Sequence, residues 1–145
     1  MKKSILILLG IIPFFVGYGI NYLVMGPFYN TVPPFTLFGI LFLIAWFLFG
    51  RYSYKLVDNK KLAIVLGNLV ALIVLALILY QEFILGQYWS GFVGIATQFY
   101  YLPLIRIVAV FTGSFHTLSP TYIVAFLIMC IVFYFGCQTS KHHTK

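Results

Sequence analysis

The stretch YYLPLIRIVAV, residues 100–110, decides the fold of this chain. It places Pro103 and Arg106 inside an otherwise apolar run. Proline has no backbone N–H and disrupts a helix interior. An arginine at the centre of a membrane helix costs ~2.5–3.5 kcal/mol on insertion scales. Whether this run crosses a membrane therefore depends on the sequence that flanks it.

The composition predicts an integral membrane protein. The chain has 145 residues, of which 63% are hydrophobic, 20% aromatic and 8% charged, with a mean hydropathy of +1.06. A soluble domain of this size cannot bury so much apolar surface, whereas hydrocarbon solvates it. The net charge of +7 sits in short basic clusters between apolar runs, a pattern of membrane topology that does not indicate a nucleic-acid partner.

Four apolar runs are long enough to cross a bilayer, which requires about 20 helical residues. They cover residues 4–25, 33–52, 62–85 and 120–138, within a single membrane domain spanning residues 1–145. The apolar residues are continuous rather than alternating, so the sequence predicts an all-α fold and not a barrel. We interpret the first run as an uncleaved span and not a signal peptide, because its apolar residues continue to a length that crosses a bilayer.

The basic residues predict the orientation of these spans. Eight of the nine lie before the first span, in the loop at residues 51–61, or after the fourth span. Cytoplasmic loops are enriched in lysine and arginine, so we expect both termini and this loop in the cytoplasm of a bacterial-type plasma membrane. Residues 86–119 then lie outside. These eight basic residues are Lys2, Lys3, Arg51, Lys55, Lys60, Lys61, Lys141 and Lys145.

A fifth apolar stretch, about residues 91–113, is expected to enter the outer leaflet without crossing it. A fifth span would place the basic C-terminus outside, against the charge bias. Pro103 and Arg106 also oppose a straight crossing. We expect an interfacial or re-entrant segment built of two short helices hinged near Pro103, with five full spans as the alternative.

Four residues are candidates for ligand or lipid binding. Arg106 has the fork geometry that binds phosphate or carboxylate, and its long stem allows it to snorkel to an interface. Glu82 is an acid near the outer end of the third span, where it is expected to be solvated or paired with Arg106. Tyr100 and Tyr101 have the polar-tipped rings that prefer the headgroup zone.

Small and amide residues on shared helix faces are expected to mediate helix packing. Small residues allow helices in a membrane to approach closely, and amides form hydrogen bonds between them. The predicted packing positions are Gly10, Gly17 and Asn21 in the first span, Gly39 in the second, and Gly67 and Asn68 in the third.

The sequence favours a non-catalytic function. It contains no acidic cluster for a metal, no phosphate-binding glycine motif and no nucleophilic constellation, so we expect no catalytic residue, metal or cofactor. The leading hypothesis is an accessory or interaction subunit of a larger membrane or envelope system that contacts lipid headgroups. The alternative is a small oligomeric transporter or channel using Glu82, Arg106 and Asn21. The expected partners are membrane lipids together with a larger membrane protein or further copies of the chain.

Overall fold

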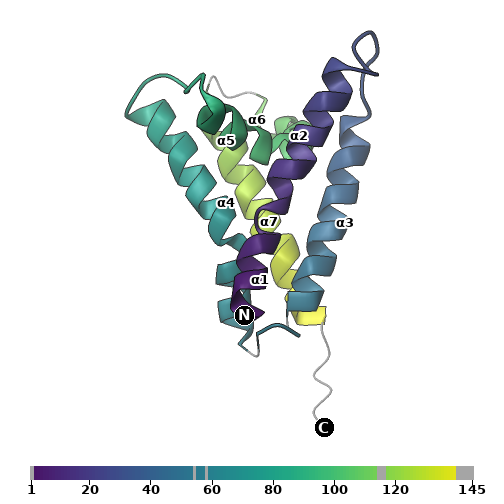
Figure 1. The fold of residues 1–145 in the computed structure, drawn as a ribbon, viewed down its shortest axis with the longest axis vertical. Helices are drawn as coiled ribbons and strands as arrows, with labels where there is room; N and C mark the ends of the chain where they lie inside the picture. Colours follow the sequence, from purple (N-terminus) through teal and green to yellow (C-terminus); the bar gives the residue numbers. More distant parts are fainter. Residues whose placement is uncertain (1, 54, 58, 114–116, 140–145) are drawn as a thin grey trace.

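The computed structural model describes residues 2–53, 55–57, 59–113 and 117–139, and it is helical with no strand in these ranges. Figure 1 shows the arrangement of the helices. Along the described chain they are α1 (Lys2–Leu9), α2 (Ile12–Met25), α3 (Phe35–Ser53), α4 (Lys60–Phe83), α5 (Phe92–Tyr100), α6 (Leu102–Thr112) and α7 (Ser119–Thr139).

Four helical segments are long and apolar enough to cross a membrane. They are Lys3–Met25, Phe35–Ser53, Lys60–Phe83 and Ser119–Thr139, close to the four runs expected from the sequence. Helices α5 and α6 are long and apolar enough to cross a membrane only when they are taken together, and the pair is bent by 62°. The expectation of an all-helical chain with several apolar helices, compatible with a multi-pass membrane protein, is confirmed.

The long helices run between two ends of the molecule, which we call the lower and the upper end. At the lower end α1 and α4 begin and α3 and α7 end, as the bottom of Figure 1 shows. At the upper end α4 finishes close to the start of α7, where the Ser119 amide donates a hydrogen bond of 3.4 Å to the Glu82 carboxylate. The segment between these residues therefore begins and ends at the upper end of the bundle.

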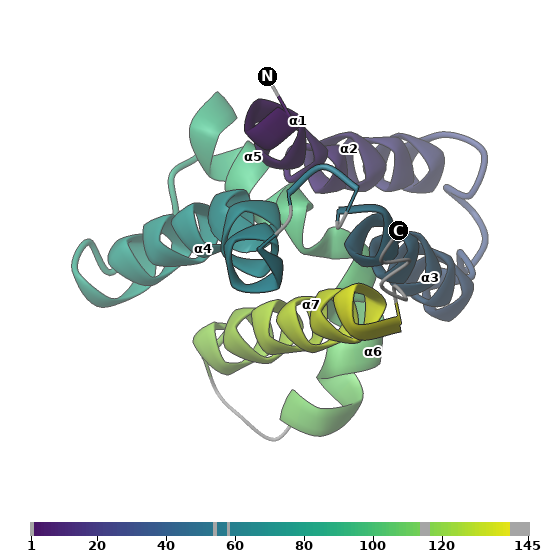
Figure 2. The ribbon, with the colours of Figure 1, turned by 90° about the horizontal axis from the view of Figure 1, so that it is seen from below.

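Helices α5 and α6 occupy the upper half of the bundle. Figure 1 shows them in the opening between α4 on one side and α2 and α3 on the other. Seen from below in Figure 2, they run across the bundle rather than along it. α5 packs on α2 and α4, and α6 packs on α3 and α7, so this bent pair fills a space that the long helices leave open.

The first span contains a break that the sequence analysis did not anticipate. α1 ends at Leu9 and α2 begins at Ile12. Pro13 lies in the first turn of α2, where a missing N–H costs least. The Phe14 amide bonds to the Ile11 carbonyl at 3.1 Å, so the Gly10 carbonyl loses its usual helical donor.

The break in the fifth stretch lies at Tyr101, two residues before the expected hinge. Pro103 is instead in the first turn of α6, where proline is tolerated. The helix is interrupted before Pro103 because the proline nitrogen carries no hydrogen. It therefore cannot donate the helical hydrogen bond to the carbonyl four residues earlier. Two short helices were expected here and two are present.

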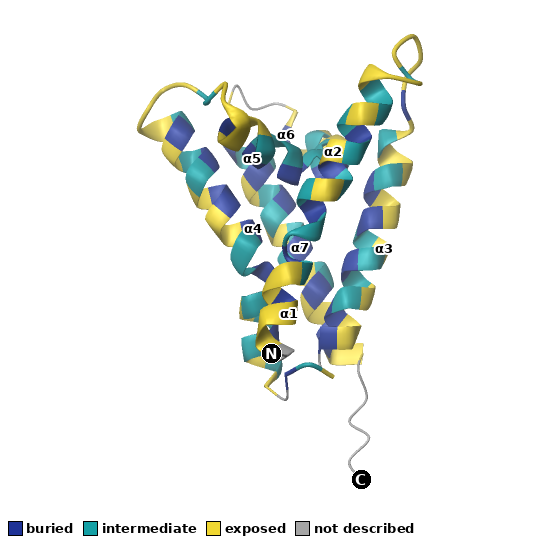
Figure 3. Cartoon of the chain, in the orientation of Figure 1, coloured by how far each residue is buried: buried dark blue, intermediate teal, exposed yellow. Residues whose placement is uncertain are grey.

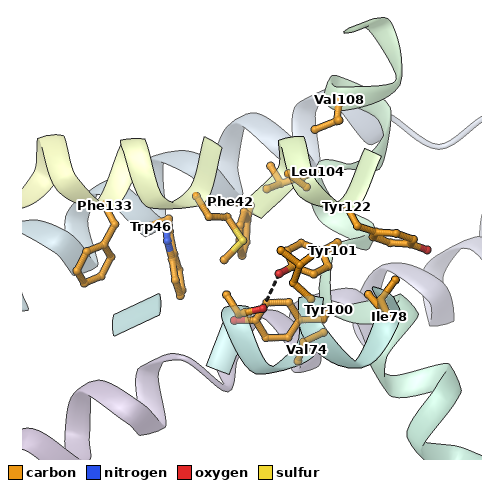
Figure 4. Packing of buried hydrophobic residues seen from close by; sticks show 14 of the residues in the cluster. Phe42, Trp46, Val74, Ile78, Tyr100, Tyr101, Leu104, Val108, Tyr122 and Phe133 are labelled. Carbon is orange, nitrogen blue, oxygen red and sulfur yellow. Dashed lines mark hydrogen bonds between the residues drawn. The ribbon is translucent and has the colours of Figure 1, made fainter. Parts of the chain in front are cut away.

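The core lies between α3, α4, α6 and α7, and its centre is aromatic. Figure 3 shows the buried residues on the inner faces of the helices and the exposed residues on the outer faces. Figure 4 shows the rings of Tyr100, Tyr101 and Tyr122 close together in this core. Trp46 stacks on Phe42, with ring centroids 5.7 Å apart.

Candidate functional site

Arg106 lies in an open cleft between α3 and α6. The cleft has a volume of about 700 Å³ and is lined by residues 32–37 on one side and by Leu102, Ile105, Arg106 and Ala109 on the other. Arg106 is exposed and is the only charged residue among these. A single cation in an apolar cleft favours a ligand that combines an anionic group with hydrocarbon.

The start of α3 contributes to the same cleft. The Phe35 and Phe38 amides donate to the carbonyls of Pro33 and Pro34, at 2.8 Å and 3.1 Å. The N–H groups of Thr36 and Leu37 belong to the first helical turn, where no carbonyl within the helix accepts them. The positive end of the α3 dipole therefore lies beside Arg106, and both features favour an anion.

Glu82 lies near the end of α4, as expected, but its partners do not include Arg106. Its carboxylate accepts hydrogen bonds from the Tyr88 hydroxyl and from the Ser119 amide. Among the described residues Arg106 is not a partner, so the expected ion pair between Glu82 and Arg106 is not formed. Glu82 instead joins the end of α4 to the first turn of α7, where a carboxylate interacts favourably with the helix dipole.

Tyr88 is held in its neutral, donating form by this contact. Burial of the ring and the hydrogen bond to the Glu82 carboxylate both raise the pKa of Tyr88 above its usual range. Tyr88 follows α4 in the connection to α5. The hydrogen bonds of Tyr88 and Ser119 to Glu82 therefore tie that connection to both α4 and α7.

Tyr100 and Tyr101 are buried inside the protein and are not exposed at its surface. Both side chains have 0% exposure. The Tyr100 hydroxyl donates to the Gly10 carbonyl at 2.9 Å, and the Tyr101 hydroxyl donates to the Ala71 carbonyl at 2.7 Å. Figure 4 shows the Tyr101 bond as a dashed line in the core. We therefore correct the interfacial interpretation: these hydroxyls reach carbonyls at the break of the first span and in the middle of α4.

Gln81 is a polar contact that the sequence analysis missed. It is fully buried, its side-chain oxygen accepts from the Trp89 amide at 2.9 Å, and its side-chain nitrogen lies 3.5 Å from the Thr97 hydroxyl. It continues the buried face of α4, which runs through Ala71, Val74 and Ile78 at helical spacing. That spacing was the available signal, because it places Gln81 on the inward face.

Glycines at the predicted packing positions lie where helices come close. A Cβ at Gly17 would overlap the carbonyl of Phe99 in α5, and one at Gly39 would meet Pro103 and Ile107 in α6. Gly10 faces Val70 of α4. A Cβ at Gly67 would meet the Phe133 ring of α7.

The two asparagines are placed differently. Asn68 is buried, and its amide donates at 2.9 Å to the Ile64 carbonyl of its own helix. Its side-chain oxygen has no hydrogen-bond partner among the described residues. Asn21 is partly buried on α2. Neither Asn21 nor Glu82 lines the Arg106 cleft, so the three residues of the transporter hypothesis are not brought together there.

Comparison of the chain with protein-family models, with curated proteins and with solved structures finds no match.

Proposed function

We propose that this chain is a non-catalytic plasma-membrane protein that binds anionic lipid headgroups in the Arg106 cleft and acts as an accessory subunit of a larger membrane or envelope system. Both termini lie in the cytoplasm, and the bent α5–α6 pair is a re-entrant segment of the outer leaflet. The observation that carries the lipid-binding proposal is the lone Arg106 guanidinium in a cleft of about 700 Å³.

The distribution of charge supports this orientation. Five basic residues belong to the lower end, where α1 and α4 begin and α3 ends. They are Lys3, Arg51, Lys55, Lys60 and Lys61. Arg106 belongs to α6 in the upper half. With the lower end in the cytoplasm, the basic residues follow the positive-inside bias and Arg106 reaches outer-leaflet headgroups.

Lipid-dependent thermal stability tests the headgroup proposal. An anionic phospholipid added to the protein in neutral detergent should raise its melting temperature more than a zwitterionic phospholipid with the same chains does. The difference should disappear in Arg106→Ala. Arg51→Ala is the matched control, because it removes the same charge at the lower end and should keep the response. An equal response in wild type and Arg106→Ala would contradict the proposal.

Soluble glycerol phosphate distinguishes an anchored headgroup from a free anion. It carries the same phosphate without hydrocarbon, so it should stabilise the protein far less than the lipid does. Equal stabilisation by both would assign the cleft to a free anion instead.

The accessory role is tested by purification in mild detergent. A larger membrane protein recovered in fixed stoichiometry supports it. A pure homo-oligomer would favour the alternative of a small transporter or channel. One observation favours that alternative: the breaks of α1–α2 and α5–α6 meet at the bond between Tyr100 and Gly10, and interrupted helices mark the binding sites of many transporters.

A further inference from the structure

A second apolar groove lies between α2 and α3 and shares no lining residue with the Arg106 cleft. It has a volume of about 410 Å³. One wall runs from Ile12 to Leu23 on α2 and the other from Phe38 to Phe49 on α3. Every lining side chain is aliphatic or aromatic, apart from Gly19. No charge or hydroxyl is available there to recognise a polar solute.

The groove exists because consecutive helices pack on other partners. α2 packs on α5 and α6, whereas α3 packs on α6 and α7. Gly19 has no side chain to fill the groove from the α2 wall, and a Cβ at that position would meet no atom within 4 Å. On the α3 wall Leu41 is 54% exposed. An unfilled space of this kind forfeits dispersion contacts along both walls.

The length of the groove fits one hydrocarbon chain. Each wall covers eleven residue steps, which is about 16 Å at 1.5 Å per residue. One leaflet contributes about half of the ~30 Å hydrocarbon core. The groove begins at Leu23 and Phe38, close to the upper ends of α2 and α3, and it reaches Trp46 and Phe49 deeper in the bundle.

We propose that this groove holds a single acyl chain of a phospholipid whose headgroup lies at the upper end. The chain replaces direct packing of α2 on α3 and remains bound when bulk lipid is removed. A length of about 16 Å along the two helices and a wholly apolar lining select an unbranched chain over a compact polar ligand. This inference does not rest on the Arg106 cleft, since the two sites can be filled independently.

Trp46 provides a local reporter of the chain. The sequence has two tryptophans, so Trp89→Phe leaves Trp46 as the only one. Trp46 is itself only 1% exposed, yet it lines the groove. Phospholipids with bromine near the chain end should quench its fluorescence more strongly than those brominated near the headgroup, because Trp46 lies towards the deep end.

Filling the groove gives the decisive comparison. Gly19→Leu in the Trp89→Phe background adds a side chain where the structure has open space, and it should remove most of the quenching. Gly91→Leu is the matched control, because its added Cβ also meets no atom and it lies outside the groove. It should leave quenching unchanged. Equal quenching in both variants would overturn the proposal, since Trp46 would then report bulk lipid.

Photo-crosslinking gives an answer that needs no variant. A phospholipid with a diazirine near its chain end is bound first, bulk lipid is removed with detergent, and irradiation after this wash should label α2 and α3 at the groove. Leu72 and Ile73 are exposed on α4 and sample bulk lipid. Labelling of these two residues at the same level as the groove, or no labelling of the groove when irradiation follows the detergent wash, would contradict a bound chain.

Discussion

The hydroxyl of Tyr100 donates a hydrogen bond of 2.9 Å to the carbonyl oxygen of Gly10, and this bond joins the two interrupted segments of the molecule at their breaks. Gly10 lies between α1 and α2, and Tyr100 is the last residue of α5. Because the Phe14 amide bonds to Ile11, the tyrosine supplies the donor that the helix does not. A carbonyl buried in a membrane protein has no water that could replace the lost donor.

Tyr100→Phe should therefore destabilise the protein more than Tyr101→Phe. The first substitution leaves the Gly10 carbonyl without a donor, which costs about 1–3 kcal/mol. The second removes a bond to Ala71, a residue inside α4 whose carbonyl also accepts in the helical ladder, so the loss should be nearer the ~0.6 kcal/mol average for polar contacts in membrane proteins. Unfolding titrations in mixed micelles measure both losses.

The exposed Tyr18 provides the control for these two variants. Tyr18→Phe removes the same atom from a ring that is 63% exposed, and it should change the unfolding free energy little. Equal losses for the variants at positions 18 and 100 would show that the Gly10 contact does not stabilise the fold.

Glu82 and Arg106 should behave as independent sites. Glu82→Ala removes the acceptor for Tyr88 and Ser119, and we expect a loss of about 1–3 kcal/mol. Arg106→Ala should change stability by less than about 1 kcal/mol in neutral detergent, because the side chain is exposed. The double variant should be additive within about 0.5 kcal/mol. A coupling energy well above that value would show that Glu82 and Arg106 do form an ion pair.

The positions of the long helices could be predicted from the sequence because the bilayer sets their length. The third span shows this well: the expected run at residues 62–85 became α4 at Lys60–Phe83. Asn59 fixes its start, since its side chain accepts from the Lys61 and Leu62 amides. Such local signals are readable without tertiary structure.

The candidate site was less predictable because its residues depend on distant partners. A tyrosine suits both a headgroup zone and a core that offers a free carbonyl, and only the break at Gly10 decides between these for Tyr100. Glu82 and Arg106 carry opposite charges, yet α4 and α6 orient them toward different neighbours. Composition and charge cannot specify which helix faces which.

Cysteine labelling should confirm the orientation proposed for the bundle. In a background without Cys130 and Cys137, a membrane-impermeant maleimide added outside should label probes at Asn30 and Gln87, which lie in exposed upper connections. Probes at Lys55 and Thr139, at the lower end, should react only after permeabilisation. Labelling of Thr139 from outside together with Asn30 would rule out four spans with both termini inside.

Gly17 and Gly19 give the sharpest test of how the α5–α6 pair is seated. They lie two residues apart on α2. A Cβ at Gly17 would overlap the backbone carbonyl of Phe99, whereas a Cβ at Gly19 would meet nothing within 4 Å. Because backbone cannot move aside as a flexible side chain does, Gly17→Ala should separate α2 from α5, at a cost of about 1–3 kcal/mol. Gly19→Ala should be neutral or slightly stabilising, since alanine favours a helix over glycine by up to ~1 kcal/mol. Unfolding titrations of the two variants, measured side by side, decide the matter. Equal stability of both would mean that α5 does not pack against Gly17, and that the bent pair sits elsewhere in the bundle.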